Sequence, residues 1–224
     1  MTRFICLKQG HKYGVEYVNI LHNRIRRQVS GLTEFVCYTD TPDQAFDEGI
    51  TVINLPHLPQ LYGWWWKCWI LSQPHPGRNL YMDLDMLIVG DCDVYAPLGS
   101  GLTGLWNIRH LNSSILAWND SLPEIFKQFE TKKGFYLGSG GVMGDQEVIN
   151  DTASKGNLEL KYWPESYTAW LDVKTKHLAR SWNGTQKTIV CKGPRNPHEH
   201  LDHKLVQLYW KPYEPFRTYI KKEV

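Results

Sequence analysis

The sequence lacks several features that would assign it to a common functional class. No apolar run approaches the length of a membrane-spanning helix, and the first residues enter a strand pattern without the long apolar core of a secretion signal. The first loop contains neither the GxGxxG pattern of dinucleotide-binding folds nor the Walker pattern of phosphate-binding loops. We therefore expect no stable membrane insertion, and dinucleotide oxidoreductases and P-loop phosphotransferases lose support.

A strong charge of one sign and a pattern of paired cysteines are also missing. The net charge is only +2, and acidic and basic residues are interspersed, which argues against a dedicated nucleic-acid-binding surface. The five cysteines are scattered, with no CxxC pair and no zinc-ligand spacing. Reduced, mostly buried thiols fit this distribution, so we expect a cytoplasmic protein without a nucleic-acid partner.

Aromatic residues are the abundant part of the composition. The chain of 224 residues has ten tryptophans and twelve tyrosines, and most of these rings belong to a core. Flat rings also stack on bases and sugars, so the enrichment mildly favours a carbohydrate or nucleotide ligand.

The amino-terminal half alternates strand and helix patterns. Residues 4–7 predict a strand, apolar residues at helical spacing from Val15 to Ile25 predict a helix, and residues 34–38 and 50–55 predict two more strands. Strand, loop, helix and strand in this order begin a Rossmann-like nucleotide-binding half.

The pattern becomes less regular after residue 60. Residues 62–72 predict a helix, which residues 74–77 end, and residues 102–108 and 114–118 predict strands separated by a turn at 109–112. Helices are expected at 124–131 and from Asp145, which lies close to the helix N-cap. Beyond residue 155 we expect irregular structure with strands at 176–181 and 188–191, then a surface helix or frayed tail over 211–224.

Asp83 and Asp85 stand where a predicted buried strand ends. Apolar runs flank them at residues 79–82 and 86–89, and ligands of open α/β sheets bind just outside such strand ends. Two buried like charges need a cation, a hydrogen-bond network or solvent. Mg²⁺ or Mn²⁺ held jointly with substrate phosphates meets that need, and a solvated turn is the alternative.

Four short motifs follow one another along the chain. They are Asp83-Leu84-Asp85, Asn112-Ser113-Ser114-Ile115, Gly144-Asp145-Gln146 and Lys192-Gly193-Pro194-Arg195-Asn196-Pro197-His198. Their order resembles the glycosyltransferases of the GT-A fold, and most of all the glycogenin-like glycosyltransferase family 8. That family carries D-x-D, then N-S-G/A, then D-Q, then H-x-x-G-x-x-K-P-W. The first and third motifs match well, the second fairly, and the last is degenerate.

The resemblance covers most of residues 1–200 and implies a fold. That fold is α/β, a Rossmann-like nucleotide-diphospho-sugar transferase (GT-A) fold in which helices flank a mixed central sheet. It implies one domain over residues 1–224, with a nucleotide-binding half over about 1–100, a donor-sugar and acceptor half over about 101–210, and a tail over 211–224.

The resemblance also implies roles for individual residues. Asp83 and Asp85 would bind Mn²⁺ (or Mg²⁺) and the nucleotide diphosphate, with Asp83 also near the ribose. Lys67 matches a basic residue placed against phosphate or donor sugar, with a surface lysine as the alternative. Asp145 would lie near the anomeric carbon, and helix capping is an alternative or additional role. The remaining contacts implied by analogy are Asn112 and Gln146 at the donor sugar, Lys8, Lys12 and Tyr13 at the base and phosphates, and Asp40 at uracil or ribose.

The third metal position departs from the family pattern. The family has a histidine there, whereas the alignment puts Val190 or Lys192 at that place. A lysine would set its charge directly on the diphosphate. Alternatively, one of the three histidines of the carboxy-terminal segment reaches back as a ligand, or that segment is only a polar surface. The three histidines are His198, His200 and His203.

The leading hypothesis is a metal-dependent glycosyltransferase that moves a hexose from a nucleotide diphosphate sugar, a UDP-sugar above others, to an unidentified hydroxyl acceptor. Family resemblance implies retention of anomeric configuration. Two alternatives remain: a non-catalytic nucleotide-sugar-binding domain, and a metal-dependent nuclease or phosphatase that uses the aspartate pair with a carboxy-terminal histidine. The near-neutral charge gives the nuclease little help.

Overall fold

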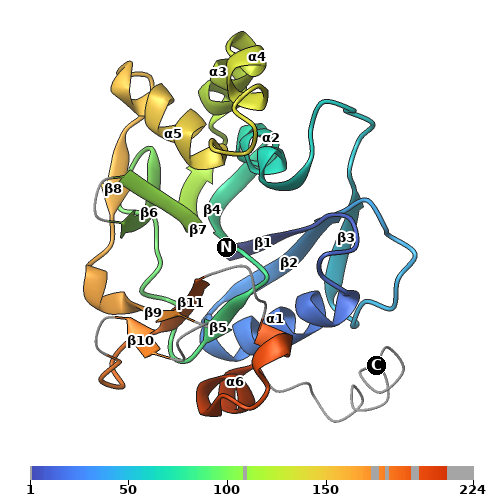
Figure 1. The fold of residues 1–224 in the computed structure, drawn as a ribbon, viewed down its shortest axis with the longest axis vertical. Coiled ribbons are helices and arrows are strands. Elements are labelled where there is room, and N and C mark those ends of the chain that lie inside the picture. Colours follow the sequence, from blue (N-terminus) through green and yellow to red (C-terminus); the bar gives the residue numbers. More distant parts are fainter. Residues whose placement is uncertain (1, 108–109, 173–176, 180–181, 193–196, 211–224) are drawn as a thin grey trace.

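The computed structural model describes residues 2–107, 110–172, 177–179, 182–192 and 197–210. Two sheets and several helices form the molecule (Figure 1). The strands are β1 Thr2–Lys8, β2 Leu32–Thr39, β3 Ile50–Asn54, β4 His75–Met82, β5 Met86–Ile88, β6 Leu102–Asn107, β7 His110–Asp120, β8 Leu160–Tyr162, β9 Thr168–Asp172, β10 His177–Ala179 and β11 Thr188–Lys192. The α-helices are α1 Val15–Gln28, α2 Trp66–Ser72, α3 Pro123–Thr131, α4 Lys133–Leu137, α5 Asp145–Ser154 and α6 Lys204–Tyr209, with 3₁₀ turns at Gly63–Trp65, Glu165–Tyr167 and Pro197–His200.

The larger sheet is mixed and has seven strands in the order β3-β2-β1-β4-β7-β6-β8. Strands β1 to β4 pair in parallel, β7 runs antiparallel to both β4 and β6, and β8 is again parallel to β6. The smaller sheet has the order β10-β9-β11-β5. Because β5 follows β4 after three residues, the chain passes from the large sheet to the small one at the acidic loop, Asp83–Asp85.

Two apolar clusters hold these layers together. On one side of the large sheet, the buried face of α1 with Tyr17 and Ile25 packs together with residues of the small sheet and of α6. On the other side, α2, α3 and α5 contribute Ile70, Ile125 and Val148. Figure 1 shows α2, α3, α4 and α5 grouped above the large sheet and α1 with α6 below it. The large sheet is therefore buried on both faces, as its continuous apolar strands predict.

The predictions for the amino-terminal half are confirmed, and so are the strand before Asp83 and the helices at 124–131 and from Asp145. The turn expected at 109–112 is wrong, because His110, Leu111 and Asn112 belong to β7 and pair with β6. Packing accounts for this. Leu111 is fully buried, and its Cδ1 would lie 2.3 Å from a Cβ at Gly104, so a glycine on β6 makes room for it.

Residues beyond 155 are more regular than expected. The sequence predicts β10 and β11 approximately, but misses the short strands β8 and β9 and the helix α6. Strand β9 lies between β10 and β11 in the small sheet; β10 follows it directly, but β11 is about twenty residues further along the chain. The tail expected at 211–224 lies outside the described residues. Within the described part of the chain, no helix combines the length and the apolar character needed to cross a membrane.

Candidate active site

The acidic loop lies at the carboxyl end of β4, as the sequence predicts. The Asp83 N–H donates to the Ser114 carbonyl at 2.9 Å, which continues the pairing of β4 with β7. Leu84 is buried in the core and anchors the middle of the loop. The side chains of Asp83 and Asp85 both line a cavity of about 690 Å³, a size typical of small-molecule sites.

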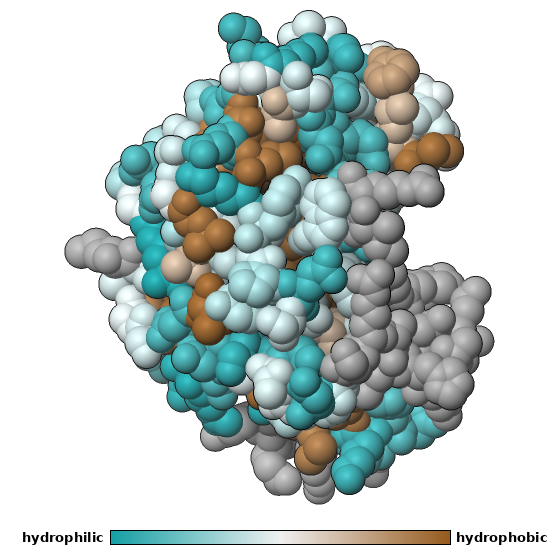
Figure 2. All heavy atoms as spheres, turned by 90° about the vertical axis from the view of Figure 1, so that its left-hand side faces the viewer, coloured by the Kyte–Doolittle hydropathy of each residue, from teal (hydrophilic) through white to brown (hydrophobic). Residues whose placement is uncertain are grey.

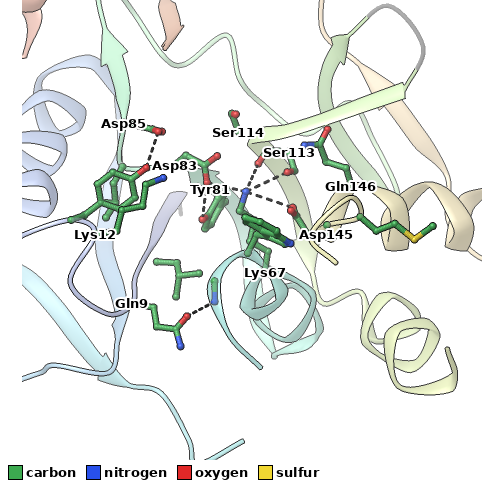
Figure 3. Close-up of a pocket in the computed structure, with 18 of the residues that line it drawn as sticks. Gln9, Lys12, Lys67, Tyr81, Asp83, Asp85, Ser113, Ser114, Asp145 and Gln146 are labelled. Carbon is green, nitrogen blue, oxygen red and sulfur yellow. Dashed lines mark hydrogen bonds and ion pairs between the residues drawn. The ribbon is translucent and has the colours of Figure 1, made fainter. Parts of the chain in front are cut away.

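Five segments of the chain surround this cavity (Figure 3). The loop after β1 contributes Gln9 to Tyr13, the 3₁₀ turn contributes Gly63 and Trp64, and β7 contributes His110, Ser113 and Ser114. The acidic loop, the start of α5 and the loop before α5 also line the cavity, together with Leu7, Lys67 and Tyr81.

Lys67 on α2 is the cation at the centre of the site. Its side chain is 7% exposed, and Nζ lies 2.9 Å from Asp83 Oδ1 and 3.5 Å from Asp145 Oδ2. The same nitrogen donates to the carbonyl and hydroxyl oxygens of Ser113, both at 3.3 Å. Burial lowers the pKa of Lys67, but the carboxylates of Asp145 and Asp83 outweigh it and raise that pKa overall. The lysine is therefore a fixed positive charge, and the surface alternative is wrong.

Asp145 is the first residue of α5 and is almost fully buried. Gly144 is the N-cap, and its N–H donates to Glu147 Oε2 at 2.6 Å, which starts the helix at this point. The Trp64 indole packs closely on this position, since a Cβ at Gly144 would lie 3.0 Å from Nε1. Burial raises the pKa of Asp145, and Lys67 partly offsets that effect. Asp145 Oδ2 accepts no hydrogen bond from any described residue.

Asp85 lies on the other side of the acidic loop. Burial raises the pKa of its carboxyl group, and the charge of Asp83 raises it further. The Tyr13 hydroxyl donates to Asp85 Oδ2 at 2.8 Å, and the Lys12 ammonium lies 4.6 Å from the centre of the Tyr13 ring. Tyr13 and Lys12 both line the cavity, and their predicted place at the base and phosphates stays a prediction.

The two carboxylates suit a divalent cation. Asp83 uses Oδ1 for both Lys67 and the Tyr81 hydroxyl, and Asp85 uses Oδ2 for Tyr13, so each keeps a second oxygen for a metal. Hard cations bind such oxygens and complete their shell from substrate phosphates. Among the described residues, no three His, Cys, Asp or Glu side chains gather in a metal-binding arrangement.

The structure does not bring His198 to the carboxylates. Its Nδ1 is hydrogen-bonded to the Tyr17 hydroxyl, and Tyr17 in turn packs on Tyr13 with ring centres 4.8 Å apart. His203 accepts the Leu205 N–H at the start of α6. The side chains of Lys192 and His200 lie outside the described part of the structure.

The place of Val190, which the family motif aligns with the third metal ligand, can be read from the pairing of β11. Strand β11 pairs with β5 so that Val190 stands opposite Met86, the residue after Asp85. The end of β11 therefore passes beside the acidic loop. Val190 itself is buried in the core and has no ligand atom in its side chain, so it supplies no metal bond.

Three further predicted residues lie outside the cavity lining. Lys8 is buried, with Nζ donating to Thr41 Oγ1 at 2.9 Å, and burial lowers its pKa. Asp40 accepts the Gly10 N–H at 3.0 Å. Both residues thus shape the loop that carries Lys12. Asn112 accepts the Ser114 N–H at 3.0 Å within β7.

The lining includes residues that the sequence did not mark as part of the site, among them Ser113, Gln9, Trp64 and His110. Ser113 stands in the second motif beside Asn112, the residue that the resemblance indicated, but Ser113 and Ser114 line the cavity and Asn112 does not. Gln9, Trp64 and His110 had no motif to mark them. Gln9 accepts the Gly63 N–H with its side-chain oxygen, and so joins the first loop to the turn that carries Trp64. Gln146 lines the cavity, and its contact with a donor sugar stays a prediction.

Solved structures share this architecture. The glycosyltransferase GlyE of Streptococcus pneumoniae TIGR4 superposes with a TM-score of 0.68 over 94% of this chain at 13% identity. This chain spans 60% of the length of GlyE. The galactosyltransferase LgtC, solved with donor and acceptor sugar analogs, has a TM-score of 0.59 at 13% identity and covers 96% of this chain and 99% of its own. No protein-family model and no curated protein matches the sequence.

These similarities establish the fold. The chain has the α/β GT-A fold, with a mixed seven-stranded sheet flanked by helices, as the sequence predicts. The identities are too low to assign an activity, so function has to be argued from the cavity itself.

Proposed function

We propose that this chain is a metal-dependent glycosyltransferase that moves a hexose from a nucleotide diphosphate sugar, a UDP-sugar, to a hydroxyl acceptor. One observation carries the proposal: three carboxylates and a buried lysine converge in one cavity at the carboxyl end of β4. The two superposed structures named above, both described as glycosyltransferases, support the same reaction class.

The charges of the cavity favour a divalent cation. Four carboxylates line the cavity, those of Asp83, Asp85, Asp145 and Glu147, against the ammonium groups of Lys12 and Lys67. Mn²⁺ or Mg²⁺ held by Asp83 and Asp85 would balance this excess and would bind the diphosphate. When bound, the ion supplies Lewis-acid neutralisation of the leaving diphosphate.

Lys67 lies between the proposed binding sites for the diphosphate, at Asp83, and for the donor sugar, at Asp145. By its contacts with Asp83 and Asp145, it fixes the diphosphate-binding loop relative to the start of α5. Its ammonium also adds positive charge close to the departing phosphate, where charge develops in the transition state. Lys67 is thus a positioning residue for both carboxylates and an electrostatic contributor.

Asp145 and Gln146 act at the sugar. Asp145 Oδ2 is buried with the Lys67 ammonium 3.5 Å away, and its remaining lone pair suits a sugar hydroxyl group as donor. A carboxylate held there also stabilises an oxocarbenium-like centre. Retention of anomeric configuration belongs to this proposal, and NMR of the product measures it directly.

Lys12 and Tyr13 act at the nucleotide end. Tyr13 holds the Asp85 carboxylate by its hydroxyl group, and the exposed Lys12 adds positive charge beside the phosphates. Lys8 and Asp40 support that loop from behind through Thr41 and Gly10.

A screen of nucleotide sugars tests the proposal. Each donor is incubated with the full chain and Mn²⁺ or EDTA, and both donor hydrolysis and the melting temperature are measured. We expect at least one UDP-sugar to be hydrolysed, and UDP to raise the melting temperature much more with Mn²⁺ than with EDTA, following RT ln(1 + [L]/Kd).

Three outcomes would reject parts of the proposal. Equal thermal shifts with Mn²⁺ and EDTA would remove the metal role of Asp83 and Asp85. Metal-dependent binding without hydrolysis of any donor, in the presence of simple sugar acceptors, would identify a non-catalytic binding domain. Hydrolysis of p-nitrophenyl phosphate in place of nucleotide sugars would favour the phosphatase alternative.

A further inference from the structure

A second, smaller cavity lies between the edge of the large sheet and the small sheet. It has a volume of about 200 Å³, and it shares no lining residue with the first cavity. Its walls come from β6, from the 3₁₀ turn before β9, from β9 itself and from the loop before β11. Figure 2 shows the side of the molecule that carries β8 and β9, where pale ring-bearing side chains gather near the centre.

Three tryptophans form the apolar walls. Trp163 is buried, and its indole N–H donates to the Ala96 carbonyl at 2.9 Å, so its ring plane is fixed. Trp170 is also buried, whereas Trp106 is 36% exposed. Trp106 packs edge-on against Tyr162 at 5.0 Å between ring centres, which holds its ring at the mouth of the cavity. These are rigid, flat surfaces with little entropy left to lose on binding.

Neutral amides form the polar wall. Gln186 is 6% exposed, and its side-chain oxygen accepts the Asn183 N–H at 3.1 Å. Asn183 in turn accepts both the N–H and the hydroxyl of Thr185, at 3.0 and 2.7 Å. The loop therefore orients two amide groups at the cavity before any ligand arrives. Glu165 also lines the cavity, and none of the described lining residues is a lysine or an arginine.

We propose that this second cavity binds one neutral sugar ring of a saccharide. Tryptophan faces beside oriented amides and a carboxylate match the apolar face and the hydroxyl groups of a hexose. The volume is below the 300–1,000 Å³ or so of drug-sized ligands and leaves room for a single ring.

The site also has a defined relation to the first cavity. Trp106 on β6 lines the second cavity and His110 on β7 lines the first, and Asn107, next to Trp106, pairs directly with His110. One hairpin therefore borders both. A saccharide longer than one unit, held at the second cavity, lies beside the hairpin that borders the first. Binding at the second cavity does not require the reaction proposed for the first.

Fluorine NMR of the full chain labelled with 5-fluorotryptophan tests the proposal. The Trp106 resonance is assigned by its loss in Trp106→Phe. The probes are glucose, galactose, N-acetylglucosamine, lactose and choline at millimolar concentration. We expect at least one of the sugars to shift the Trp106 resonance with saturation, and to do so equally in Asp85→Asn, where the first cavity is altered.

Two variants locate the binding site. Ser166 is exposed at the cavity, and Ser166→Phe should fill it and abolish the shift, while Trp106→Ala should weaken sugar binding about tenfold by calorimetry. Trp64→Phe, a change of an exposed tryptophan at the first cavity, is the control and should bind as wild type. No shift with any sugar, a shift with choline alone, or a shift lost in Trp64→Phe or Asp85→Asn but kept in Ser166→Phe would overturn the proposal.

Discussion

The two ends of β4 bury titratable side chains in opposite ways. At the start of the strand, His75 is 5% exposed and packs between the rings of Tyr38 and Trp118. Burial lowers its pKa to about 4, so it is neutral at physiological pH. Beyond the end of the strand, Lys67 is equally buried but remains charged because carboxylates surround it.

The difference shows what burial does with and without a counter-charge. His75 faces the Tyr38 hydroxyl at 3.2 Å, a neutral partner, and gives up its charge. Lys67 faces Asp83 and Asp145 and keeps it. A neutral buried side chain adds to stability without a large desolvation penalty. A buried cluster of charges has a high desolvation penalty, so its presence suggests that the charges serve another purpose, such as ligand binding. The predictions below alter one end of β4 at a time.

Loss of Lys67 should have the largest effect. Lys67→Met leaves the buried carboxylate of Asp145 and the partly buried carboxylate of Asp83 without their partner, so the free energy of unfolding should fall by about 3–5 kcal/mol. Adding Asp145→Asn to it should recover part of that loss, because one uncompensated charge disappears. Urea denaturation measures both. Lys127→Met, a change of an exposed lysine on α3, is the control. Equal stability of Lys67→Met and wild type would show that the ion pairs of Lys67 do not contribute to the free energy of unfolding.

Acid should destabilise the protein through the other end of the strand. The pKa of His75 lies below its ordinary value of 6.5, at about 4, so the unfolded chain takes up the proton first as the pH falls. The contribution of neutral His75 to the free energy of unfolding is fully present above pH 6.5 and is lost as the pH falls to about 4. At about 1.4 kcal/mol per pKa unit, the total loss is about 3 kcal/mol.

His75→Gln should flatten that dependence. Denaturation at a series of pH values between those limits gives the slope for each variant. His57→Gln, at an exposed histidine, should keep the wild-type slope. The same slope in His75→Gln and wild type would assign the acid sensitivity to other groups.

Asp145→Asn separates catalysis from binding at the charged end. The change keeps the shape of the side chain, so affinity for UDP should stay nearly intact while turnover falls a hundredfold or more, about the effect of a lost electrostatic group. Asp151→Asn on the same helix removes a half-exposed carboxylate bound by Lys132 and Tyr136, and should leave turnover unchanged. A wild-type rate in Asp145→Asn would reassign Asp145 to helix capping.

Tyr13→Phe should have the smallest effect. It removes a single hydrogen bond to the Asp85 carboxylate, a bond worth about 1.5 kcal/mol, so Mn²⁺-dependent UDP affinity should weaken about tenfold. Tyr162→Phe removes a hydroxyl far from the acidic loop in the sheet and is the matched control. Titration of UDP at several Mn²⁺ concentrations measures this affinity for each variant. Identical binding curves for Tyr13→Phe and Tyr162→Phe would exclude a role for the hydrogen bond between Tyr13 and Asp85.

The sequence predicts the parts of this site that depend on local pattern. Asp83 and Asp85 follow a continuous apolar strand, and the start of α5 is marked by Gly144, so both could be located from neighbours in the chain. The direction of side chains that depends on contacts between distant segments could not be predicted in this way. Lys8 and Asp40 end neighbouring parallel strands, but their side chains turn to the loop behind the cavity, which only the register of the folded sheet decides.

The same limit explains the missed strands. Strand β8 has three residues, and β9 pairs with β11 across a separation of about twenty residues. Short strands carry too little periodicity to stand out from aromatic-rich loops. The charge state of Lys67 was equally hidden, because it arises from carboxylates on the acidic loop and on α5 that are remote in the sequence.

The passage of the chain from one sheet to the other has a mechanical consequence. Met82 is the last residue of β4 in the large sheet, and Met86 is the first residue of β5 in the small one. The distance between the carboxylates of Asp83 and Asp85 therefore depends on the angle between the two sheets. A ligand that binds both carboxylates fixes that angle, so the two sheets should open together rather than separately. Backbone amides of β9 and β11, strands with no residue in the described lining of the cavity, should then exchange with solvent more slowly once the cavity is filled.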